Sequence, residues 1–401
     1  MPRRAWIAVL LFLSVVINYI DRQCLSVLAP VITKELQLTP TGYAAILNWF
    51  QVAYTVMYVG SGLLVDRWGA KVSLGVFMGW WSVANALHAF ATNAAGLGVF
   101  RFLLGLGEPG NFMAGFRAIS DCFQKQERAM VNGLLNAGSS VGAMVAPFLV
   151  TWLYGQLSWR GAFVVCGALG VVWIPLWLAS YEPLDGGAAR KAKPAGWQRY
   201  LWLPQSFGLM GSRFLSDPVW WFYLFWLPKY LVDARGFTLK EMALVAWMPY
   251  LSADLGAMAG GWASGVLIGR GWDVVRARTA VMLPAALMMP VSLIVGTTPS
   301  AAVAIGGICL VTFAHMAWKT NLSTVTNDLY PAEVVGSVSG VFAFGNGLGG
   351  LLFTALTGWV VEVSGYFWVF ALMGVLHPLA FLVFRGLVRG ELKLAGAEGG
   401  E

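Results

Sequence analysis

The chain has 401 residues, of which 58% are hydrophobic and only 11% are charged, and its formal net charge is +7. Soluble domains carry about 25% charged residues, so this composition excludes an ordinary water-soluble globular protein. The basic residues lie in short connections between apolar runs rather than in one stripe or on a recognition helix, which argues against nucleic-acid binding.

Apolar runs of about 20 residues recur along the whole chain and predict transmembrane helices. The first run resembles a secretory signal, but no small-residue cleavage site follows it, so we interpret it as a retained first helix. The expected spans are 7–29, 43–65, 72–92, 96–117, 129–153, 161–180, 207–231, 243–268, 278–297, 301–325, 335–361 and 366–386.

The pattern predicts an all-α membrane protein with twelve transmembrane helices in two six-helix lobes. The N-terminal lobe would cover 1–181 and the C-terminal lobe 206–388. Between them, 182–205 is polar and rich in Gly, Pro and basic residues, as a cytoplasmic linker would be, and 389–401 forms a cytoplasmic tail. Six spans on each side of a linker are typical of a transporter with internal repeats.

The distribution of Lys and Arg predicts the orientation. With the N-terminus inside, most basic residues in the connections and at the span ends lie on the cytoplasmic side, and the outer side receives only Lys34, Arg160, Lys229, Arg235 and Lys240. Cytoplasmic connections carry such an excess of positive charge. We therefore expect a multi-pass protein of the cell inner (plasma) membrane with both termini in the cytoplasm.

Eight charged residues fall inside the expected spans and away from the span ends, where each unpaired charge is costly and is rarely without a function. They are Asp21, Arg22, Arg101, Glu108, Arg213, Asp217, Asp254 and Lys319. Four cations suit an anionic substrate, and because arginine binds carboxylates in bidentate fashion, an organic acid fits better than a cation. The competing interpretation of each charge is a salt bridge that locks helices together.

Helical spacing separates the charges of the first half. Asp21 and Arg22 are adjacent and point roughly 100° apart, so one can face a cavity while the other reaches a neighbouring helix. Arg101 and Glu108 are seven residues apart and share a helix face. Glu108 lies among apolar neighbours, which makes it a candidate for proton exchange, and Pro109 should kink the helix after it.

In the second half, Arg213 and Asp217 are four residues apart and can pair directly, as a gating or a structural contact. Asp254 fits a proton site, a partner of Lys319 or a polar packing group equally well.

Polar side chains at helical spacing could complete a site for a sugar-like molecule. The candidates are Asn136 and Ser139 on the fifth span, Asn321 and Asn346 in the second half, and the hydroxyls of Tyr19 and Tyr54. Hydrogen bonds from helix to helix explain any one of them equally well.

Two GxGxxG matches, at 105–110 and 345–350, do not follow strands, and no P-loop or nucleophilic triad order occurs. We expect no enzyme activity, cofactor, metal site or nucleic-acid partner. The expected partners are a small organic anion, protons and the lipid bilayer, and the expected state is a monomer.

The connection after the second span reads "GLLVDRWGAK", from Gly62 to Lys71. It resembles the G-x-x-x-D-R-x-G-x-[RK] signature of the major facilitator superfamily, which lies between the second and third helices. The resemblance implies that Asp66 and Arg67 bridge helix ends at the cytoplasmic face and hold one gating state. The corresponding second-half stretch, "GVLIGRGWD", has Gly269 in place of the acid.

Within that superfamily the chain resembles the anion:cation symporter family over about residues 5–388. The similar stretches are "NYIDRQCLSVLAP", "RFLLGLGEPGNF", "WRGAF", "NLSTVTNDLYP" and "DPVWWFYLFWLPKYL", the last most like the hexuronate transporter branch.

This resemblance implies roles for individual residues. Arg22 would bind the substrate carboxylate with help from Tyr54, Asp21 and Glu108 would carry the coupled protons, and Arg101 would tune Glu108. The expected activity is import of an organic anion, such as a hexuronate, by proton symport with alternating access. An organic anion/phosphate antiporter and a passive carboxylate uniporter are the alternatives.

Overall fold

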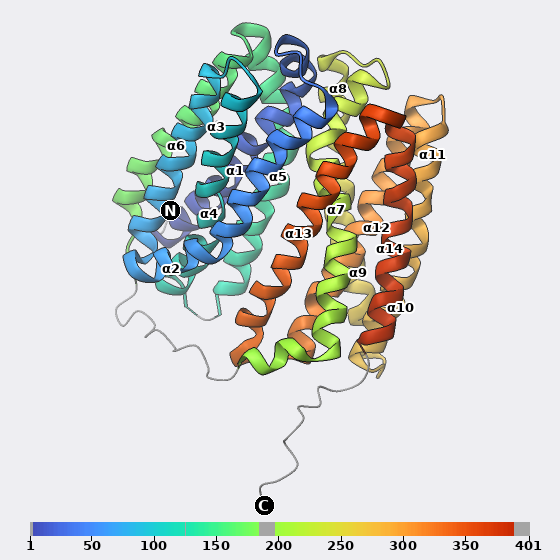
Figure 1. Cartoon of the computed structure of the whole chain (residues 1–401). Coiled ribbons are helices and arrows are strands. Elements are labelled where there is room, and N and C mark those ends of the chain that lie inside the picture. Colours follow the sequence, from blue (N-terminus) through green and yellow to red (C-terminus); the bar gives the residue numbers. More distant parts are fainter. Residues whose placement is uncertain (1–2, 125, 184–196, 389–401) are drawn as a thin grey trace, which may run out of the picture. The chain divides into compact units, whose positions relative to one another are not determined.

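The computed structural model describes residues 3–124, 126–183 and 197–388. Within these ranges the regular secondary structure consists of helices, without a β-strand (Figure 1). The first half contains α1 (Arg3–Glu35), α2 (Pro40–Leu87), α3 (Ala94–Gly107), α4 (Pro109–Cys122), α5 (Arg128–Gln156) and α6 (Trp159–Ser180).

The second half contains more and shorter helices. They are α7 (Pro204–Asp233), α8 (Leu239–Val245), α9 (Met248–Gly269), α10 (Val274–Met288), α11 (Ser292–Thr297), α12 (Ala301–Leu329), α13 (Ala332–Ser364) and α14 (Tyr366–Leu387). Short 3₁₀ turns lie at His88–Phe90, Trp197–Trp202 and Met289–Val291. The pairs α8–α9 and α10–α11 each follow one expected span, so the helices account for the twelve expected spans.

Eight helical segments of the described chain are long and apolar enough to cross a membrane by length and composition. The four other expected spans lie in α2, in α3 together with α4, and in α7. With 48 residues, α2 is long enough for two crossings, at about 20 residues for each.

Two local features explain where the first-half helices break. Within α2, Gly69 has φ 74° and ψ 167°, a conformation that is essentially restricted to glycine, and it separates the second span from the third. At the end of α3 the helix is interrupted at Glu108, and α4 begins with Pro109, which has no backbone N–H to donate. The helix is thus interrupted beside Pro109, where a kink was expected, while Glu108 itself keeps helical dihedral angles of φ −61° and ψ −39°.

The chain divides into two compact units. Unit 1 is Met1–Arg190 with Leu224–Trp247, and unit 2 is Lys191–Tyr223 with Met248–Glu401, so α7 contributes to both. The expected lobe boundaries stay a prediction. Most of the expected linker at 182–205 and the whole tail at 389–401 lie outside the described residues.

Close helix packing builds the core of unit 1, where α1 lies against α5 and α6, and α2 lies against α3, α4 and α6. Glycines permit the approach of α5 to α1. A Cβ atom on Gly138 would lie 2.7 Å from the Phe12 carbonyl oxygen, and one on Gly142 would lie 2.6 Å from that of Val16. Small residues at such contacts are typical of transmembrane helix pairs. This packing holds the charged segment of α1 inside the unit.

Candidate functional site

A buried ion pair joins α1 to the junction of α3 and α4 in unit 1. Both Arg22 Nε and Arg22 Nη2 contact the same oxygen of Glu108, Oε2, at 2.7 Å and 2.6 Å. Arg22 is 2% exposed and Glu108 is 0% exposed. The second carboxylate oxygen, Glu108 Oε1, has no hydrogen-bond partner among the described residues. The pair therefore leaves part of its hydrogen-bonding capacity unused.

Aromatic rings surround the Arg22 guanidinium. Its Cζ lies 4.6 Å from the ring centroid of Tyr19, 4.9 Å from that of Tyr54 and 5.6 Å from that of Phe50. Rings at these distances attract a cation through their negative faces. They also exclude water, so an anion that replaced Glu108 would meet a desolvated arginine.

Arg101 on α3 does not form an ion pair with Glu108, although the two share a helix face as expected. Its Nη2 donates to the Arg22 carbonyl oxygen at 2.9 Å, and its guanidinium lies 5.1 Å from the Phe50 ring centroid. The side chain is fully buried, and its Nε and Nη1 have no partner in the described part of the chain. Arg101 thus adds a positive charge beside the pair and anchors α3 to α1.

Asp21 points to a different helix from its neighbour Arg22, as their 100° offset predicts. Asn85 Nδ2, on the second part of α2, donates to Asp21 Oδ1 at 2.8 Å and to the Phe163 carbonyl oxygen at 3.2 Å. Asp21 is fully buried, and its Oδ2 has no hydrogen bond within the described residues. Two carboxyl groups, Asp21 and Glu108, therefore flank Arg22 on separate helices.

The two α5 candidates differ in position. Ser139 is half-buried and lies beside the Tyr19 hydroxyl, and its own hydroxyl donates to the Asn136 carbonyl oxygen at 2.6 Å. Asn136 is exposed, and its amide donates to the Asn132 carbonyl oxygen at 2.7 Å. The structure thus brings Ser139, but not the Asn136 amide, to the aromatic group around Arg22.

The second-half charges form a separate group in unit 2. The expected Arg213–Asp217 pair is not formed, because Arg213 Nη2 donates to Ser323 Oγ at 3.1 Å, and Asp217 accepts no hydrogen bond from a described residue. Lys319 Nζ lies 6.0 Å from the ring centroid of Trp220. Helical spacing permitted the pair but could not reveal the competing acceptor on α12.

Three other second-half candidates have packing contacts. Asn321 on α12 is fully buried, and its amide donates to the carbonyl oxygens of Gly260 at 3.0 Å and Ala317 at 2.9 Å, which joins α12 to α9. Asn346 Oδ1 accepts a hydrogen bond from Trp221 Nε1 at 2.8 Å. Asp254 is half-buried and has interactions of its own.

Two histidines that are far apart in the sequence lie in contact. His315 Nδ1 and His377 Nε2 are 3.0 Å apart, and the His315 ring stacks on Trp220 with an interplanar angle of 5°. Sequence spacing gave no signal for this pair, because the two side chains come from α12 and α14. Among the described residues, no group of three or more potential ligands forms around them.

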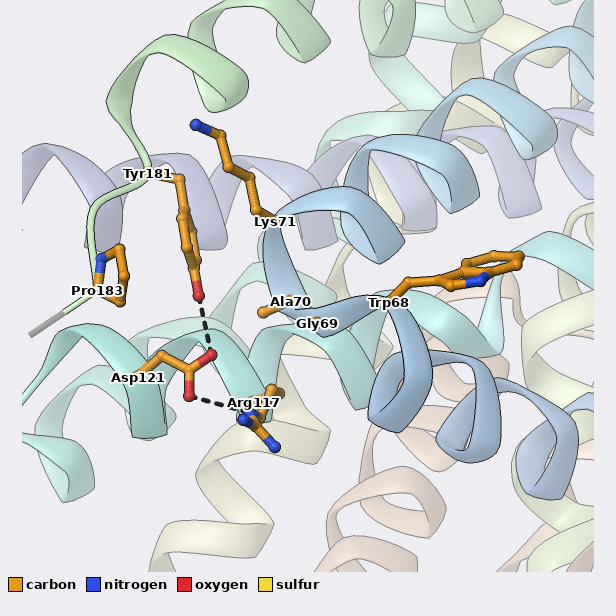
Figure 2. A pocket seen from close by; sticks show the side chains of 8 residues that line it. All are labelled: Trp68, Gly69, Ala70, Lys71, Arg117, Asp121, Tyr181 and Pro183. Atoms are coloured by element: carbon orange, nitrogen blue, oxygen red, sulfur yellow. Dashed lines mark hydrogen bonds and ion pairs between the residues drawn. The ribbon is translucent and has the colours of Figure 1, made fainter. Parts of the chain in front are cut away.

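The signature at Gly62–Lys71 lies beside a cavity of about 300 Å³ on unit 1, lined in part by Trp68, Lys71 and Pro183 (Figure 2). Asp66 and Arg67 are exposed just before the break at Gly69.

Three hydrogen-bonded side chains lie along the wall of this cavity. Arg117 Nε donates to Asp121 Oδ1 at 2.9 Å, the Tyr181 hydroxyl donates to Asp121 Oδ2 at 2.8 Å, and Lys71 points away from that carboxylate (Figure 2). Burial and the neighbouring Asp121 raise the pKa of Tyr181, which keeps the hydroxyl protonated and able to donate. These two hydrogen bonds join the end of α4 to the residue that follows α6.

Sequence reasoning missed several residues of the unit 1 site. Asn18 accepts a hydrogen bond from Arg22 Nη2 at 3.3 Å, one helical turn before it, and Phe50 contacts both arginines. The signal for Asn18 was available, because residues four apart are neighbours on a helix. Asn85 carried no such signal, since it reaches Asp21 from α2.

Comparison with known proteins agrees with this architecture. The model of the Major Facilitator Superfamily matches residues 11–354. A crystal structure of a bacterial homologue of the human lysosomal transporter Spinster, in an inward-facing and unoccupied conformation, superposes with a TM-score of 0.81 at 18% identity. The superposition covers 98% of this chain and 100% of that chain.

Similar sequences are named as sugar-acid transporters. The chain is 31% identical to the hexuronate transporter of Escherichia coli (strain K12), over 97% of this chain and 94% of that protein. It is 34% identical to the galacturonate transporter of Dickeya chrysanthemi, over 63% of this chain and 79% of that protein. The hexuronate transporter of Bacillus subtilis (strain 168) is 30% identical over 97% of this chain and 96% of its own length.

The family match and these relatives place the chain among transporters rather than enzymes. Its apolar helices make it a multi-pass protein of the inner membrane. The chain belongs to the Major Facilitator Superfamily.

Proposed function

We propose that the protein imports a hexuronate or a closely related sugar acid together with protons, by alternating access. The Arg22–Glu108 pair is the observation that carries the proposal, because it holds a carboxylate on a buried, aromatic-lined arginine. The relatives named as hexuronate and galacturonate transporters support a sugar acid as the substrate.

The pair suggests how proton and substrate binding are coupled. When Glu108 is ionised, its carboxylate forms a salt bridge with the Arg22 guanidinium. Protonation removes the negative charge of Glu108, and Arg22 is then available to the carboxylate of the substrate, which it can bind in bidentate fashion. Asp21 supplies a second carboxyl group next to Arg22 in the chain, and Arg101 adds positive charge beside both.

Other residues complete the proposal. Tyr19, Tyr54 and Ser139 would contact the hydroxyls or ring of the sugar, and Lys319, Asn321 and Asn346 would supply further polar contacts. Asp66 and Arg67 would act in gating at the cytoplasmic face, while Arg213 and Asp254 would act in gating or in structure. Substrate binding can drive the change of access only if contacts differ between the two states. The protein would work as a monomer in the bilayer.

Uptake of labelled glucuronate into proteoliposomes, with and without an inward proton gradient, tests the proposal. A symporter accumulates glucuronate above the outside concentration only with the gradient, and a protonophore abolishes the accumulation. A uniporter would equilibrate glucuronate without accumulating it, and an antiporter would exchange it for an internal anion regardless of the gradient. Either result would contradict the proposed coupling.

Two arginine variants connect this test to the site. Arg22→Ala should abolish uptake. Arg160→Ala is the matched control, because Arg160 pairs with Glu35 at a partly exposed position. The Arg160→Ala protein should transport normally. Normal uptake by Arg22→Ala would remove Arg22 from the binding site.

A further inference from the structure

The aromatic ring of Phe50 on α2 is shared by two buried guanidinium groups of unit 1. The Cζ atom of Arg22 lies 5.6 Å from the ring centroid, and the Cζ atom of Arg101 lies 5.1 Å from the same centroid. Phe50 and Arg101 are fully buried, and Arg22 is 2% exposed. Two like charges from α1 and α3 are therefore held close together around one apolar ring from α2.

Tight packing fixes the place of this ring. Gly105, one helical turn after Arg101, allows α3 to approach α2 closely, because a Cβ atom on Gly105 would lie 2.5 Å from the Phe50 carbonyl oxygen. The Phe50 ring also packs on Tyr54, with 5.4 Å between the centroids, and on Phe225 at 6.0 Å with an interplanar angle of 87°. If the attraction between the ring and the arginines were lost, the arginine side chains rather than the ring would move.

Arg101 depends on the ring more than Arg22 does. Arg22 also has two tyrosine rings and the Glu108 carboxylate around its guanidinium. In the described part of the chain, Phe50 provides the one aromatic ring over which Arg101 lies, and Arg101 Nη2 donates to the Arg22 carbonyl oxygen. That hydrogen bond alone would leave a long side chain several rotamers, and the ring contact selects among them.

The ring offsets an unfavourable arrangement of charge. Two neighbouring positive charges repel each other strongly in a medium of low dielectric constant. The negative face of an aromatic ring attracts a cation, and the attraction is stronger where water is excluded. We propose that Phe50 is a positioning residue, whose ring holds Arg22 and Arg101 close together so that the positive charge of both acts on an anion bound at Arg22.

Stepwise fluorination of the Phe50 ring tests the proposal with almost no change of shape. Fluorine withdraws electron density from the ring face, so mono-, di- and trifluorinated phenylalanine at position 50 should attract the guanidinium groups progressively less. The thermal unfolding midpoint of the purified full-length protein should therefore fall at each step. The matched control is the same series at Phe102, which packs edge-to-face on Trp49 with 5.8 Å between the centroids. Equal responses at the two positions would overturn the proposal.

Arg101→Gln separates the contributions of the two arginines. If the ring holds both of them, trifluorination at position 50 should lower the unfolding midpoint of Arg101→Gln measurably, but by less than in the wild-type background. An equal decrease in both backgrounds would assign the ring to Arg22 alone, and no decrease in Arg101→Gln would assign it to Arg101 alone. Either result would overturn the shared role.

Uptake of labelled glucuronate measures the effect on substrate, which rests on the proposed function. The KM should rise at each step of fluorination, to about tenfold for the trifluorinated ring, while Vmax stays unchanged. The Phe102 series should leave both constants unchanged. A lower Vmax at an unchanged KM would overturn the positioning role. A wild-type protein that does not transport glucuronate would contradict the proposed function, and the unfolding midpoints would still decide whether Phe50 holds the two arginines.

Discussion

Two nitrogen atoms of Arg22 contact one oxygen of Glu108, and three aromatic rings lie around its guanidinium. Such a pair gives little net stability, because both charges lose their hydration. Removal of one partner is nevertheless severe, because the other charge is left buried and alone. The pair by itself therefore adds little to the stability of the fold.

The first prediction separates folding from transport at this pair. Arg22→Met should lower the free energy of unfolding by about 3–5 kcal/mol, and Arg22→Met with Glu108→Gln should recover most of that loss. Thermal unfolding in detergent measures the stability of the single and the double variant. Neither variant should take up glucuronate. If the double variant transports glucuronate, Arg22 does not bind the substrate.

The second prediction concerns pH. In the proposed mechanism protonation of Glu108 frees Arg22, so uptake by wild-type protein should increase as the external pH falls. Glu108→Gln has a neutral side chain at every pH, so it should bind glucuronate with little pH dependence and should not accumulate it against a gradient. Binding measured over a pH series, together with gradient-driven uptake, checks both parts. A wild-type pH profile in Glu108→Gln binding would assign the proton to another group.

At the scale of helices, the break inside α2 depends on one backbone conformation. Gly69 has φ 74° and ψ 167°, which side chains other than hydrogen rarely permit. A Cβ atom at this position meets no neighbour within 4 Å, so strain of the backbone alone would set the cost of a substitution.

Gly69→Ala should therefore destabilise the protein by about 1–3 kcal/mol. Gly62→Ala is the matched control, because Gly62 also has open space around it but lies in regular helix without a positive φ, and it should be neutral or slightly stabilising. Thermal unfolding of the two variants gives the comparison. Equal stability would show that the break tolerates other conformations.

The elements also show what the sequence could and could not predict. The apolar runs predicted twelve spans, and the helices follow them, but α1, α7 and α13 extend beyond their spans because their ends are more polar. The break at Pro109 was predictable from its missing N–H. The contacts of Glu108 with Arg22 and of His315 with His377 were not, because they join helices 86 and 62 residues apart.

For the whole molecule, the orientation stays a prediction from the excess of Lys and Arg on one side. A green fluorescent protein fused to the C-terminus should be fluorescent, because it folds in the cytoplasm. A phosphatase that is active only outside the cytoplasm should be inactive when it is fused to the C-terminus. The reverse pattern would place the C-terminus outside. A fusion in the connection after α1 should give the opposite result to the C-terminal one and serves as the control.

The position of the Glu108 carboxylate on Arg22 has a consequence for affinity. In the proposed mechanism the protein contains its own competitor for the substrate, a carboxylate that cannot diffuse away and whose charge depends on pH. When a binding-competent state is only partly populated, the apparent dissociation constant rises by the inverse of that fraction. Each tenfold decrease in neutral Glu108 would therefore weaken sugar-acid binding about tenfold, and the alkaline cytoplasmic side would release the substrate without any change in the contacts of Arg22 with its aromatic rings.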